Sequence, residues 1–422
     1  MTNQEKDASY LWHPLTQHKT AKQPVLIERA KGALLYDDAG NEYIDGIASW
    51  YTCMYGHGNE YITKAMYDQM QALDFVMFSG FTHPPAITLA EKLMEILPAN
   101  QQKIFFNDNG STAVEAAIKM AFQYYHNQGD KRDTLIAFED GFHGDTFGAM
   151  SASGLSSYNG PFEDLLLKVI RIPTPQKDTI DAVCSQLEAV LTENKCAAFI
   201  FEPLAQGAAG MKFHSAQGLD ALLKLCKQHD VLTIADEIMT GFGKTGTDFA
   251  VDQLENKPDV MCLSKALTAG MFPLSITSCT QTIFDGFLSD EVHKGFFHAH
   301  TFSAHPVGCA AAIAGIELLQ STEIVARRKE IEEKHHAFAK AISSHPNASQ
   351  VRVKGVIFAL DLNVKMERYG NLRDELYQFF MQRGVALRPL GNTIYALPPY
   401  VITNNQLEKI YTVIEEALDN FN

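Results

Sequence analysis

Short apolar segments alternate with longer segments of helical periodicity over the first three quarters of the chain. Apolar runs that fit buried strands lie at residues 103–106, 134–138, 197–201, 231–235, 260–263 and 274–278. Between these runs, apolar residues spaced three or four apart predict helices, most clearly at residues 62–73, 85–97 and 219–229. Strands and helices that alternate in this order predict an α/β fold with a mostly parallel sheet.

The pattern changes at about residue 306. One long helical pattern covers residues 307–343, with a break near Ser321 and Thr322, and strand-like and helix-like segments follow it. Near the N-terminus, the string YDDAGNEYID has turn residues between two half-apolar runs, which predicts a hairpin. We interpret the last part of the chain as a smaller α+β domain that the N-terminal strands join. The predicted segments are an N-terminal part at 1–55, a large domain at 56–305 and a small domain at 306–422.

The overall charge narrows the range of partners. The chain has 422 residues, of which 46% are hydrophobic, as in ordinary globular enzymes. Its 35 Lys and Arg and its 50 Asp and Glu residues give a formal net charge of −15. This charge argues against nucleic acids and anionic membranes as partners, and an anionic substrate has to meet a local positive group.

Cysteine and histidine usage gives no sign of disulfides or metal. Seven cysteines are scattered without a CxxC pair, which favours small buried side chains in a reducing compartment. Three histidines in the string HAHTFSAHP have no carboxylate or cysteine nearby, so we predict no metal site. Because the N-terminal string MTNQEKDAS is polar and no apolar run approaches transmembrane length, we expect a cytoplasmic protein.

Two of the predicted strands each end at a charged residue. Asp236 follows residues 231–235, and Lys265 comes shortly after residues 260–263. Open α/β sheets bind ligands at the carboxyl edge of their strands, so we expect the two side chains to lie there together. Such a pair suits pyridoxal phosphate, because the lysine amine forms a Schiff base and the acid keeps the pyridine nitrogen protonated. Singly, each residue also fits a surface position or a helix cap.

A second candidate lies where residues 103–106 lead into the next helix. The string NDNGST places Gly110, Ser111 and Thr112 at this junction. A glycine lets the backbone approach an anion, and the helix N-terminus offers free N–H groups and a positive dipole end. The junction therefore fits a phosphate site, and it fits an ordinary glycine turn with a Ser/Thr cap equally well.

Three side chains on predicted loops are further candidates. Trp50 lies near the hairpin and fits either pocket lining or core packing. Phe142, beside His143, fits stacking on a flat cofactor or covering the edge of the core. Arg388 lies between apolar neighbours and suits either a substrate carboxylate or a structural salt bridge.

The string GFGKTG at residues 241–246 matches the pattern G-x-G-x-x-G. No strand runs directly into it and no clear helix follows, so it does not indicate a dinucleotide site. A nucleotide-binding protein stays open as an alternative that predicts a colourless preparation. We favour a glycine-rich wall of an active site.

Taken together, these strings resemble the class III, fold-type I family of pyridoxal-phosphate aminotransferases over almost the whole chain. The segment DEI-x-TGFG-x-TG followed by the lysine of SKAL is the most specific part. Further strings resemble the members of the class that act in biotin biosynthesis; they are LWHPLTQ, SWYT, FVMFSGFTH, HGDTFGAMS, HTFSAHPVGCAAA and RPLGNTIYALPPYVI. The resemblance implies an α/β fold with a mostly parallel seven-stranded sheet and a smaller α+β domain.

The resemblance also implies a set of cofactor-binding residues. Lys265 would hold pyridoxal 5'-phosphate and move the proton between substrate and cofactor. Asp236 would pair with the pyridine nitrogen, and Phe142 would stack on the ring. Gly110 and Ser111 would hold the phosphate group.

The substrate side involves further residues and a second copy of the chain. Thr301, with His300, would reach the phosphate bound by the neighbouring subunit, which requires a homodimer. Trp50 and the backbone of Ala299 would line the substrate pocket, and Arg388 would bind the substrate carboxylate. The implied reaction transfers an amino group from S-adenosylmethionine to 8-amino-7-oxononanoate, which yields 7,8-diaminononanoate.

Three positions depart from the family pattern. Leu15 stands in HPLT where the family has a tyrosine near the substrate, and Phe142 stands in GFHGDT where it has another. Lys244 replaces an arginine in the glycine-rich string. Because each missing phenol removes a hydrogen-bond donor, the amino donor is open between S-adenosylmethionine, lysine and another amine. A class III enzyme for ω-amino acids or diamines, and a non-catalytic protein on the same fold, also stay open.

Overall fold

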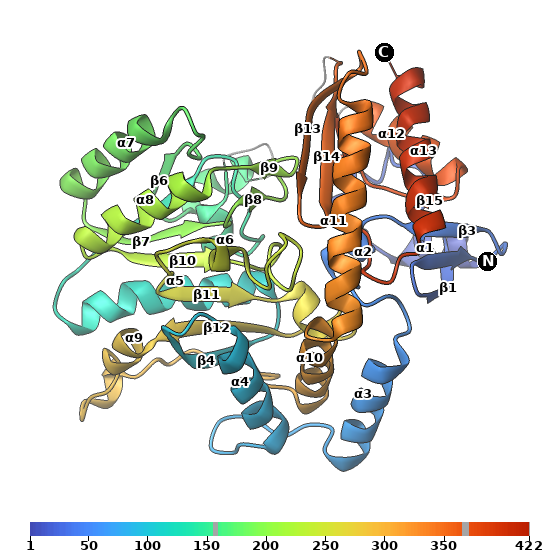
Figure 1. Cartoon of the computed structure of the whole chain (residues 1–422). Helices are drawn as coiled ribbons and strands as arrows, with labels where there is room; N and C mark the ends of the chain where they lie inside the picture. Colours follow the sequence, from blue (N-terminus) through green and yellow to red (C-terminus); the bar gives the residue numbers. More distant parts are fainter. Residues whose placement is uncertain (155–158, 365–370, 422) are drawn as a thin grey trace.

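A seven-stranded sheet forms the centre of the larger part of the molecule (Figure 1). The computed structural model describes residues 1–154, 159–364 and 371–421. In the strand order β4-β12-β11-β10-β7-β5-β6, all neighbouring pairs are parallel except those that β12 makes with β11 and β4. The strands are β4 Gln101–Asn107, β5 Thr134–Phe138, β6 Val169–Ile172, β7 Cys196–Phe201, β10 Leu232–Asp236, β11 Val260–Leu263 and β12 Ser275–Thr280.

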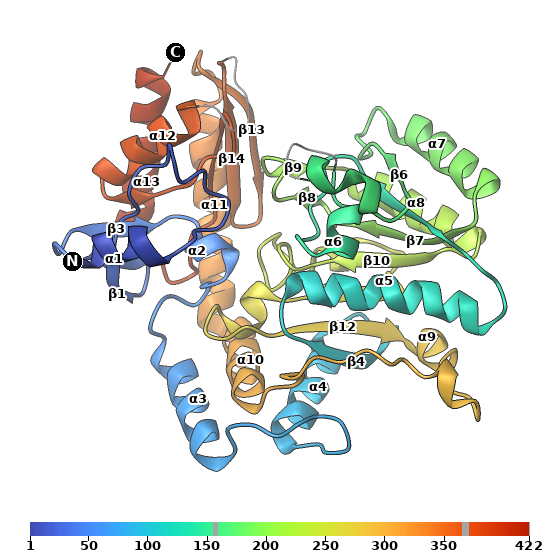
Figure 2. The ribbon, with the colours of Figure 1, turned by 180° about the vertical axis from the view of Figure 1, so that it is seen from behind.

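Helices cover both faces of this sheet. Ile234 and Val260 belong to the apolar cluster on the face of helix α5, whereas Ala235 and Met261 belong to the cluster on the face of α8. Successive residues of a strand point to opposite faces, which is why these buried strands carry apolar residues on both faces. Figure 2, seen from behind, places α5 in front of the sheet and α8 behind it. The helices of this part are α3 Glu60–Ala72, α4 Pro84–Ile96, α5 Gly110–Asn127, α6 Phe147–Ala152, α7 Ile180–Glu193, α8 Ala216–Gln228 and α9 Gln281–Asp285.

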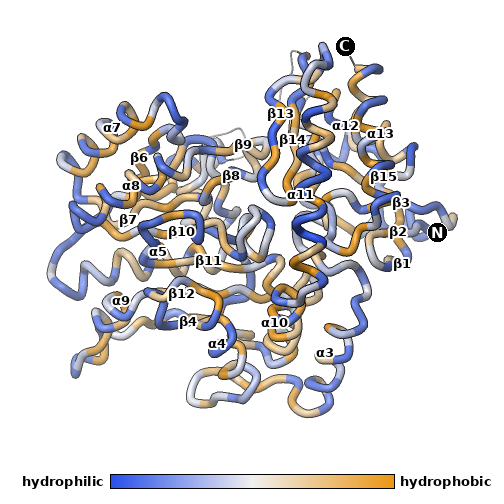
Figure 3. The backbone as a smooth tube through the Cα atoms, viewed as in Figure 1, coloured by the Kyte–Doolittle hydropathy of each residue, from blue (hydrophilic) through white to orange (hydrophobic). Residues whose placement is uncertain are grey.

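The chain then forms a smaller layer of strands and helices. Helices α10 Pro306–Leu319 and α11 Thr322–Ile342 are separate, so the predicted break in the long helical pattern is confirmed. In Figure 3, α11 is hydrophilic over much of its length, whereas β7 and β10 are mostly apolar. A three-stranded sheet packs beside α11 in the order β13-β14-β16. The elements are β13 Ala348–Lys354, β14 Ile357–Leu362, β16 Thr393–Ala396, α12 Asn371–Gln382 and α13 Asn404–Asn420.

The N-terminal strands share a sheet with this last part of the chain. The order is β1-β2-β3-β15, and β3 pairs in parallel with β15. The hairpin predicted near the N-terminus is confirmed as β2 and β3. The elements are α1 Asn3–Tyr10, β1 Ile27–Lys31, β2 Leu34–Asp37, β3 Glu42–Asp45, α2 Ala48–Tyr51 and β15 Val385–Ala386. The domain boundaries at 55 and 305 stay a prediction.

Small elements complete the fold. No single helix of the described residues is long and apolar enough to cross a membrane, although the pair Pro306–Leu319 and Thr322–Ile342, bent by 66°, meets that length and composition together. Of the strand-like segments after residue 343, the one at VALRPL forms only the short strand β15, and Pro389, which has no N–H to donate to a ladder, follows it. The remaining elements are β8 Ala205–Gln206, β9 Lys212–Phe213, η1 Gly160–Leu165, η2 Ala250–Gln253, η3 Lys265–Thr268 and η4 Val292–Lys294.

Candidate active site

Three neighbouring parallel strands, β7, β10 and β11, end at the same edge of the seven-stranded sheet. Asp236 is the last residue of β10, Glu202 follows β7 directly, and Lys265 follows β11 after Ser264. The structure therefore brings the acid and the lysine to one edge, as the two apolar runs in the sequence predict. It adds a second carboxyl group there, that of Glu202. Asp236 and Glu202 are both buried.

The side chain of Lys265 is half-buried, and its amine has no polar partner. Among the described residues it forms no hydrogen bond or ion pair, and its Nζ lies 5.7 Å from the centre of the Tyr51 ring. Burial lowers the pKa of Lys265, although the charges of Asp236 and Glu202 act in the opposite direction. A lowered pKa increases the fraction of neutral amine, which is the form that attacks a carbonyl group or takes up a proton.

Asp236 is held in place by two hydrogen bonds. The Nδ1–H of His143 donates to Oδ2 of Asp236 at 2.7 Å, and the backbone N–H of Ile238 donates to Oδ1 at 3.1 Å. The side chain of His143 is buried, and its Nε2 has no hydrogen-bond partner among the described residues. Asp236 is thus an oriented acceptor with a histidine behind it, as a partner for a protonated ring nitrogen requires.

Glu202 fixes the loop that carries Phe142. Its carboxyl group accepts hydrogen bonds from the N–H of Phe142 and the N–H of Gly207, each at 3.0 Å. Burial raises the pKa of Glu202 to about 7, and the nearby charge of Asp236 adds to that rise. The backbone of Phe142 is therefore fixed at the sheet edge, while its side chain is 42% exposed and so free to contact a ligand.

The glycine junction forms the start of the long helix α5. Asn109 caps the helix, accepting from Thr112 N at 3.1 Å, and the N–H groups of Gly110 and Ser111 lie ahead of the ladder of helix hydrogen bonds. A neighbouring loop comes close, because a Cβ on Gly144 would lie 2.1 Å from Oγ of Ser111. The described residues at this junction thus suit an anion.

These features fit pyridoxal phosphate at the sheet edge. An unpaired amine suits its aldehyde, an oriented buried carboxylate suits its ring nitrogen, and a helix N-terminus suits its phosphate group. The residues that would hold it are Lys265, Asp236, Gly110, Ser111 and Phe142.

The side chains predicted to meet the substrate lie on irregular segments. The guanidinium carbon of Arg388 lies 5.4 Å from the centre of the Trp50 ring, and both side chains are exposed. Among the described residues Arg388 has no carboxylate partner, so no structural salt bridge forms there, and its role toward a substrate carboxylate stays a prediction. Leu15 is 55% exposed and has a φ of 52°.

The segment before α10 is also largely exposed. Ala299 and Thr301 are exposed, and Nδ1 of His300 lies 3.8 Å from Oδ2 of Asp108. No hydrogen bond or ion pair of the described residues joins this segment to Lys265. The roles of these three residues toward a neighbouring subunit stay a prediction.

The glycine-rich loop lies against the smaller layer. Tyr400 donates its hydroxyl to the carbonyl of Phe242 at 2.6 Å, and Val356 N donates to the carbonyl of Lys244 at 3.0 Å. Lys244 itself is buried and donates to the carbonyl of Gly241 at 2.8 Å. Burial lowers the pKa of Lys244 to about 7, and the charge of Lys265 contributes to this shift. The loop is thus a packed wall between the two parts of the chain.

Sequence reasoning assigned no role to two residues at the sheet edge. Glu202 follows an apolar strand just as Asp236 does, and this shared pattern is the signal that could have identified it. His143 lies in the loop after β5, two strands away from β10 in the sheet. Only the strand order brings it to Asp236, so the sequence offers no direct signal.

Comparison with known proteins gives consistent results. The family described as Aminotransferase class-III matches residues 16–418. Proteins named adenosylmethionine-8-amino-7-oxononanoate aminotransferase are similar over the whole length. The one from Synechococcus elongatus is 42% identical, covering 97% of this chain and 98% of the relative, and the one from Staphylococcus aureus is 34% identical, covering 99% and 97%.

Solved structures are similar in fold as well as in sequence. A crystal structure of adenosylmethionine-8-amino-7-oxononanoate aminotransferase from Methanocaldococcus jannaschii has a TM-score of 0.93 and 31% identity, covering 99% of this chain and 98% of that one. An omega transaminase from Pseudomonas jessenii, solved in complex with PMP, has a TM-score of 0.92 and 28% identity, covering 100% and 98%.

Proposed function

The chain belongs to the class-III aminotransferase family of pyridoxal-phosphate enzymes, and from this premise we propose that it makes 7,8-diaminononanoate by transferring an amino group to 8-amino-7-oxononanoate. The observation that carries the transaminase chemistry is the half-buried, unpaired amine of Lys265 beside two buried carboxyl groups. The acceptor is supported by the names of relatives that match over the full length, and by the strings in which this chain resembles biotin-pathway members of the class.

Each polar residue of the sheet edge has a defined task in this proposal. When bound, pyridoxal phosphate supplies an electron sink that acidifies the proton on the amine-bearing carbon. Nζ of Lys265 takes that proton and returns it at a neighbouring position. Asp236 keeps the ring nitrogen protonated, and His143 holds Asp236 in the required orientation. Gly110 and Ser111 anchor the phosphate group.

Arg388 sets the acceptor's position. An acidic protein needs a local cation for an anionic acceptor, and the exposed guanidinium of Arg388 has no carboxylate partner among the described residues. The carboxylate of 8-amino-7-oxononanoate would bind there, with Trp50 packed against the guanidinium and the chain of the acceptor. The length of the acceptor then places its ketone at the sheet edge.

A second copy of the chain completes the proposed site. Thr301 is exposed on a segment whose neighbours Phe297 and Phe302 are 73% and 54% exposed, as expected for a surface that another subunit covers. We therefore expect a homodimer of the 46.8 kDa chain in which Thr301 and His300 approach the phosphate group of the other subunit. Sedimentation equilibrium tests this directly, and a monomer at micromolar concentration would contradict it. A cytoplasmic location stays a prediction.

The donor is taken to be S-adenosylmethionine, as in the relatives' names. One observation favours a second candidate. Leu15 and Phe142 present exposed apolar side chains where the resemblance expects two phenols, so lysine or another simple amine is the alternative donor.

The test supplies the cofactor-loaded enzyme with 8-amino-7-oxononanoate and, separately, S-adenosylmethionine, lysine and a diamine. Mass spectrometry then measures 7,8-diaminononanoate. We expect the diamine product with at least one donor, and the donor that yields it fastest decides between the two candidates. Faster transfer from ω-amino acids to pyruvate, with no product from the oxo acid, would contradict the proposed acceptor.

A further inference from the structure

Residues 48–51 form one turn of left-handed helix without a glycine. The φ angles of Ala48, Ser49, Trp50 and Tyr51 are 47°, 45°, 71° and 70°. The backbone is nevertheless regular, since Tyr51 N donates to the carbonyl of Ile47 at 2.9 Å. Left-handed conformations are strained for residues with a Cβ atom, and four in succession persist only where the surroundings impose them.

The carboxyl group of Asp45 imposes this conformation from the end of β3. Its Oδ1 accepts from Ser49 N at 3.0 Å, and its Oδ2 accepts from Oγ of Ser49 at 2.8 Å. Asp45 is 1% exposed, so its carboxyl end of these bonds is shielded from water. Two bonds to one residue inside the turn fix the backbone in the strained form.

His57 holds Asp45 from the other side. Its Nε2–H donates to Oδ2 of Asp45 at 2.8 Å, and its side chain is 14% exposed. The backbone of His57 is anchored in turn, because its N–H donates to the carbonyl of Gly32 at 2.8 Å and its carbonyl accepts from Gly32 N at 2.9 Å. The pair therefore connects the turn to the first strands of the N-terminal sheet.

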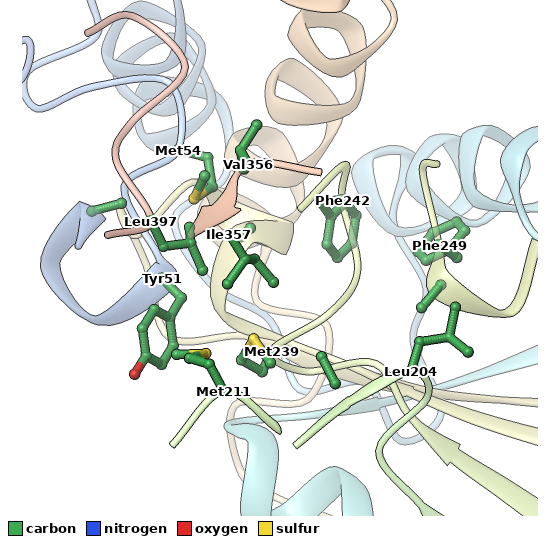
Figure 4. Close-up of a cluster of buried hydrophobic side chains, with 14 of the residues drawn as sticks. Tyr51, Met54, Leu204, Met211, Met239, Phe242, Phe249, Val356, Ile357 and Leu397 are labelled. Atoms are coloured by element: carbon green, nitrogen blue, oxygen red, sulfur yellow. The ribbon is translucent and has the colours of Figure 1, made fainter. Parts of the chain in front are cut away.

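The turn presents adjacent residues to opposite ends of the proposed site. Trp50 lies beside Arg388, and Tyr51 lies beside Lys265. Tyr51 is buried and donates its hydroxyl to the hydroxyl of Tyr395 at 2.9 Å. In Figure 4, Tyr51 appears with a cluster of buried apolar side chains at the junction of the two parts of the chain. If the turn became right-handed, the rings of Trp50 and Tyr51 would both move.

We infer that Asp45 and His57 are positioning residues which hold the left-handed turn and so fix the spacing between the Lys265 amine and the Arg388 guanidinium. The consequence is selection of the acceptor by the length between its ketone and its carboxylate. This consequence rests on the proposed function, whereas the position of Trp50 does not depend on it. A merely structural role would change stability and leave the position of Trp50 unchanged in the folded enzyme.

The experiment compares variants in a Trp12→Phe background, where Trp50 is the single remaining tryptophan. The first variants are Asp45→Asn and His57→Gln. A matched pair, Ser49→Ala and Ser49→Gly, changes an exposed residue in the turn, so both proteins are expected to fold. Both lose the hydroxyl group, but only glycine adopts positive φ without strain.

The first readout is Trp50 fluorescence of the cofactor-loaded enzyme, measured as emission maximum and quenching by acrylamide. We expect Asp45→Asn and Ser49→Ala to shift both values and Ser49→Gly to stay close to the parent. Unchanged Trp50 fluorescence in folded Asp45→Asn enzyme, or equal shifts in Ser49→Ala and Ser49→Gly, would overturn the inference. This readout needs no substrate, so it stands even if the proposed acceptor is wrong.

The second readout is steady-state kinetics with 8-amino-7-oxononanoate and with oxo acids one carbon shorter and longer. We expect Asp45→Asn to raise the KM for the natural-length acceptor about tenfold, with kcat changed much less, because the anchor and the amine are misplaced. The preference of Asp45→Asn enzyme for the natural-length acceptor over the shorter and longer acids should become smaller than that of the parent. An equal loss for all three lengths, carried by kcat, would overturn the role in selecting length.

Discussion

The two walls of the proposed site differ in how they are built. The inner wall consists of buried polar groups at the ends of regular strands, with Asp236 and Glu202 each held by two hydrogen bonds. The outer wall consists of exposed side chains on loops and on a strained turn, among them Trp50 and Arg388. The rigid sheet thus supplies the reactive groups, while segments distant in sequence supply recognition of the substrate.

This difference between the walls indicates at which positions amino-acid substitutions are tolerated. Two of the three departures from the family pattern, Leu15 and Phe142, are exposed side chains on the outer wall, whereas the third, Lys244, is buried and donates to the carbonyl of Gly241. A side chain with open space around it can change without leaving a buried group unpaired. We therefore expect inner-wall substitutions to remove the chemistry and outer-wall substitutions to alter substrate preference.

The largest effect is expected on the inner wall. Lys265→Ala should lower multiple-turnover transamination on the order of 10⁴-fold or more, because both the nucleophile and the proton carrier are lost. Lys168→Ala is the control, since Lys168 is 57% exposed in its side chain and far from this edge in the proposal. Retained turnover in Lys265→Ala enzyme would refute the role of this amine.

A smaller effect is expected for the anchor of the outer wall. Arg388→Ala should raise the KM for the oxo acid by roughly thirtyfold, about 2 kcal/mol, at the low end for a charged contact because the guanidinium is exposed. Arg388→Lys keeps the charge but loses the planar fork, so its KM should lie between that of the parent and that of Arg388→Ala. An unchanged KM in the alanine variant would remove Arg388 from the site.

The turn between the two walls should make stability depend on pH. Burial opposes the charged form of His57, but Asp45 and Cys53 outweigh it and raise the pKa of His57 from 6.5 to about 10. A pKa that is raised in the folded state stabilises the folded protein. This stabilisation is complete below about pH 6.5 and is lost as the pH rises through about 10. The free energy of unfolding should therefore fall between pH 7 and 10 by about 3 kcal/mol more in the parent than in His57→Gln. The free energy of unfolding is measured with urea at each pH. If it changes equally with pH in the parent and in His57→Gln, the charged pair of His57 and Asp45 is contradicted.

The smallest effect is expected from restoring the missing phenols. Leu15→Tyr and Phe142→Tyr each add one hydrogen-bond donor on the outer wall, worth about 1 kcal/mol or roughly fivefold in kcat/KM. We expect the ratio of kcat/KM for S-adenosylmethionine over lysine to rise, with little change for the oxo acid. Competition between the two donors in one vessel measures that ratio, and a fall in both variants would show that the phenols are not donor contacts.

The inner wall was largely predictable from the sequence. Strands β10 and β11 are short apolar runs with defined ends, and parallel strands bring their carboxyl ends to one edge, so Asp236 and Lys265 follow from pattern alone. The link from Asp236 to His143 does not, because it depends on which strands are neighbours. That order is set by packing of helices on both faces, which no single segment records.

The strained turn could not be predicted. Ala48, Ser49 and Trp50 have no preference for positive φ, and in isolation the segment would avoid it. The conformation is imposed by Asp45 and by His57, which lies beyond the turn in sequence. Tertiary contacts thus override local preference at a site residue, where such conflicts are expected.

The central claim is that the amine of Lys265 and the carboxylate of Asp236 meet across one pyridoxal phosphate molecule. The most direct test is the absorbance spectrum of the purified protein after incubation with pyridoxal phosphate and removal of excess. We predict an imine band at roughly 410–430 nm in the parent enzyme that is absent from Lys265→Ala. A parent spectrum without that band, or an identical band in the alanine variant, would contradict the claim.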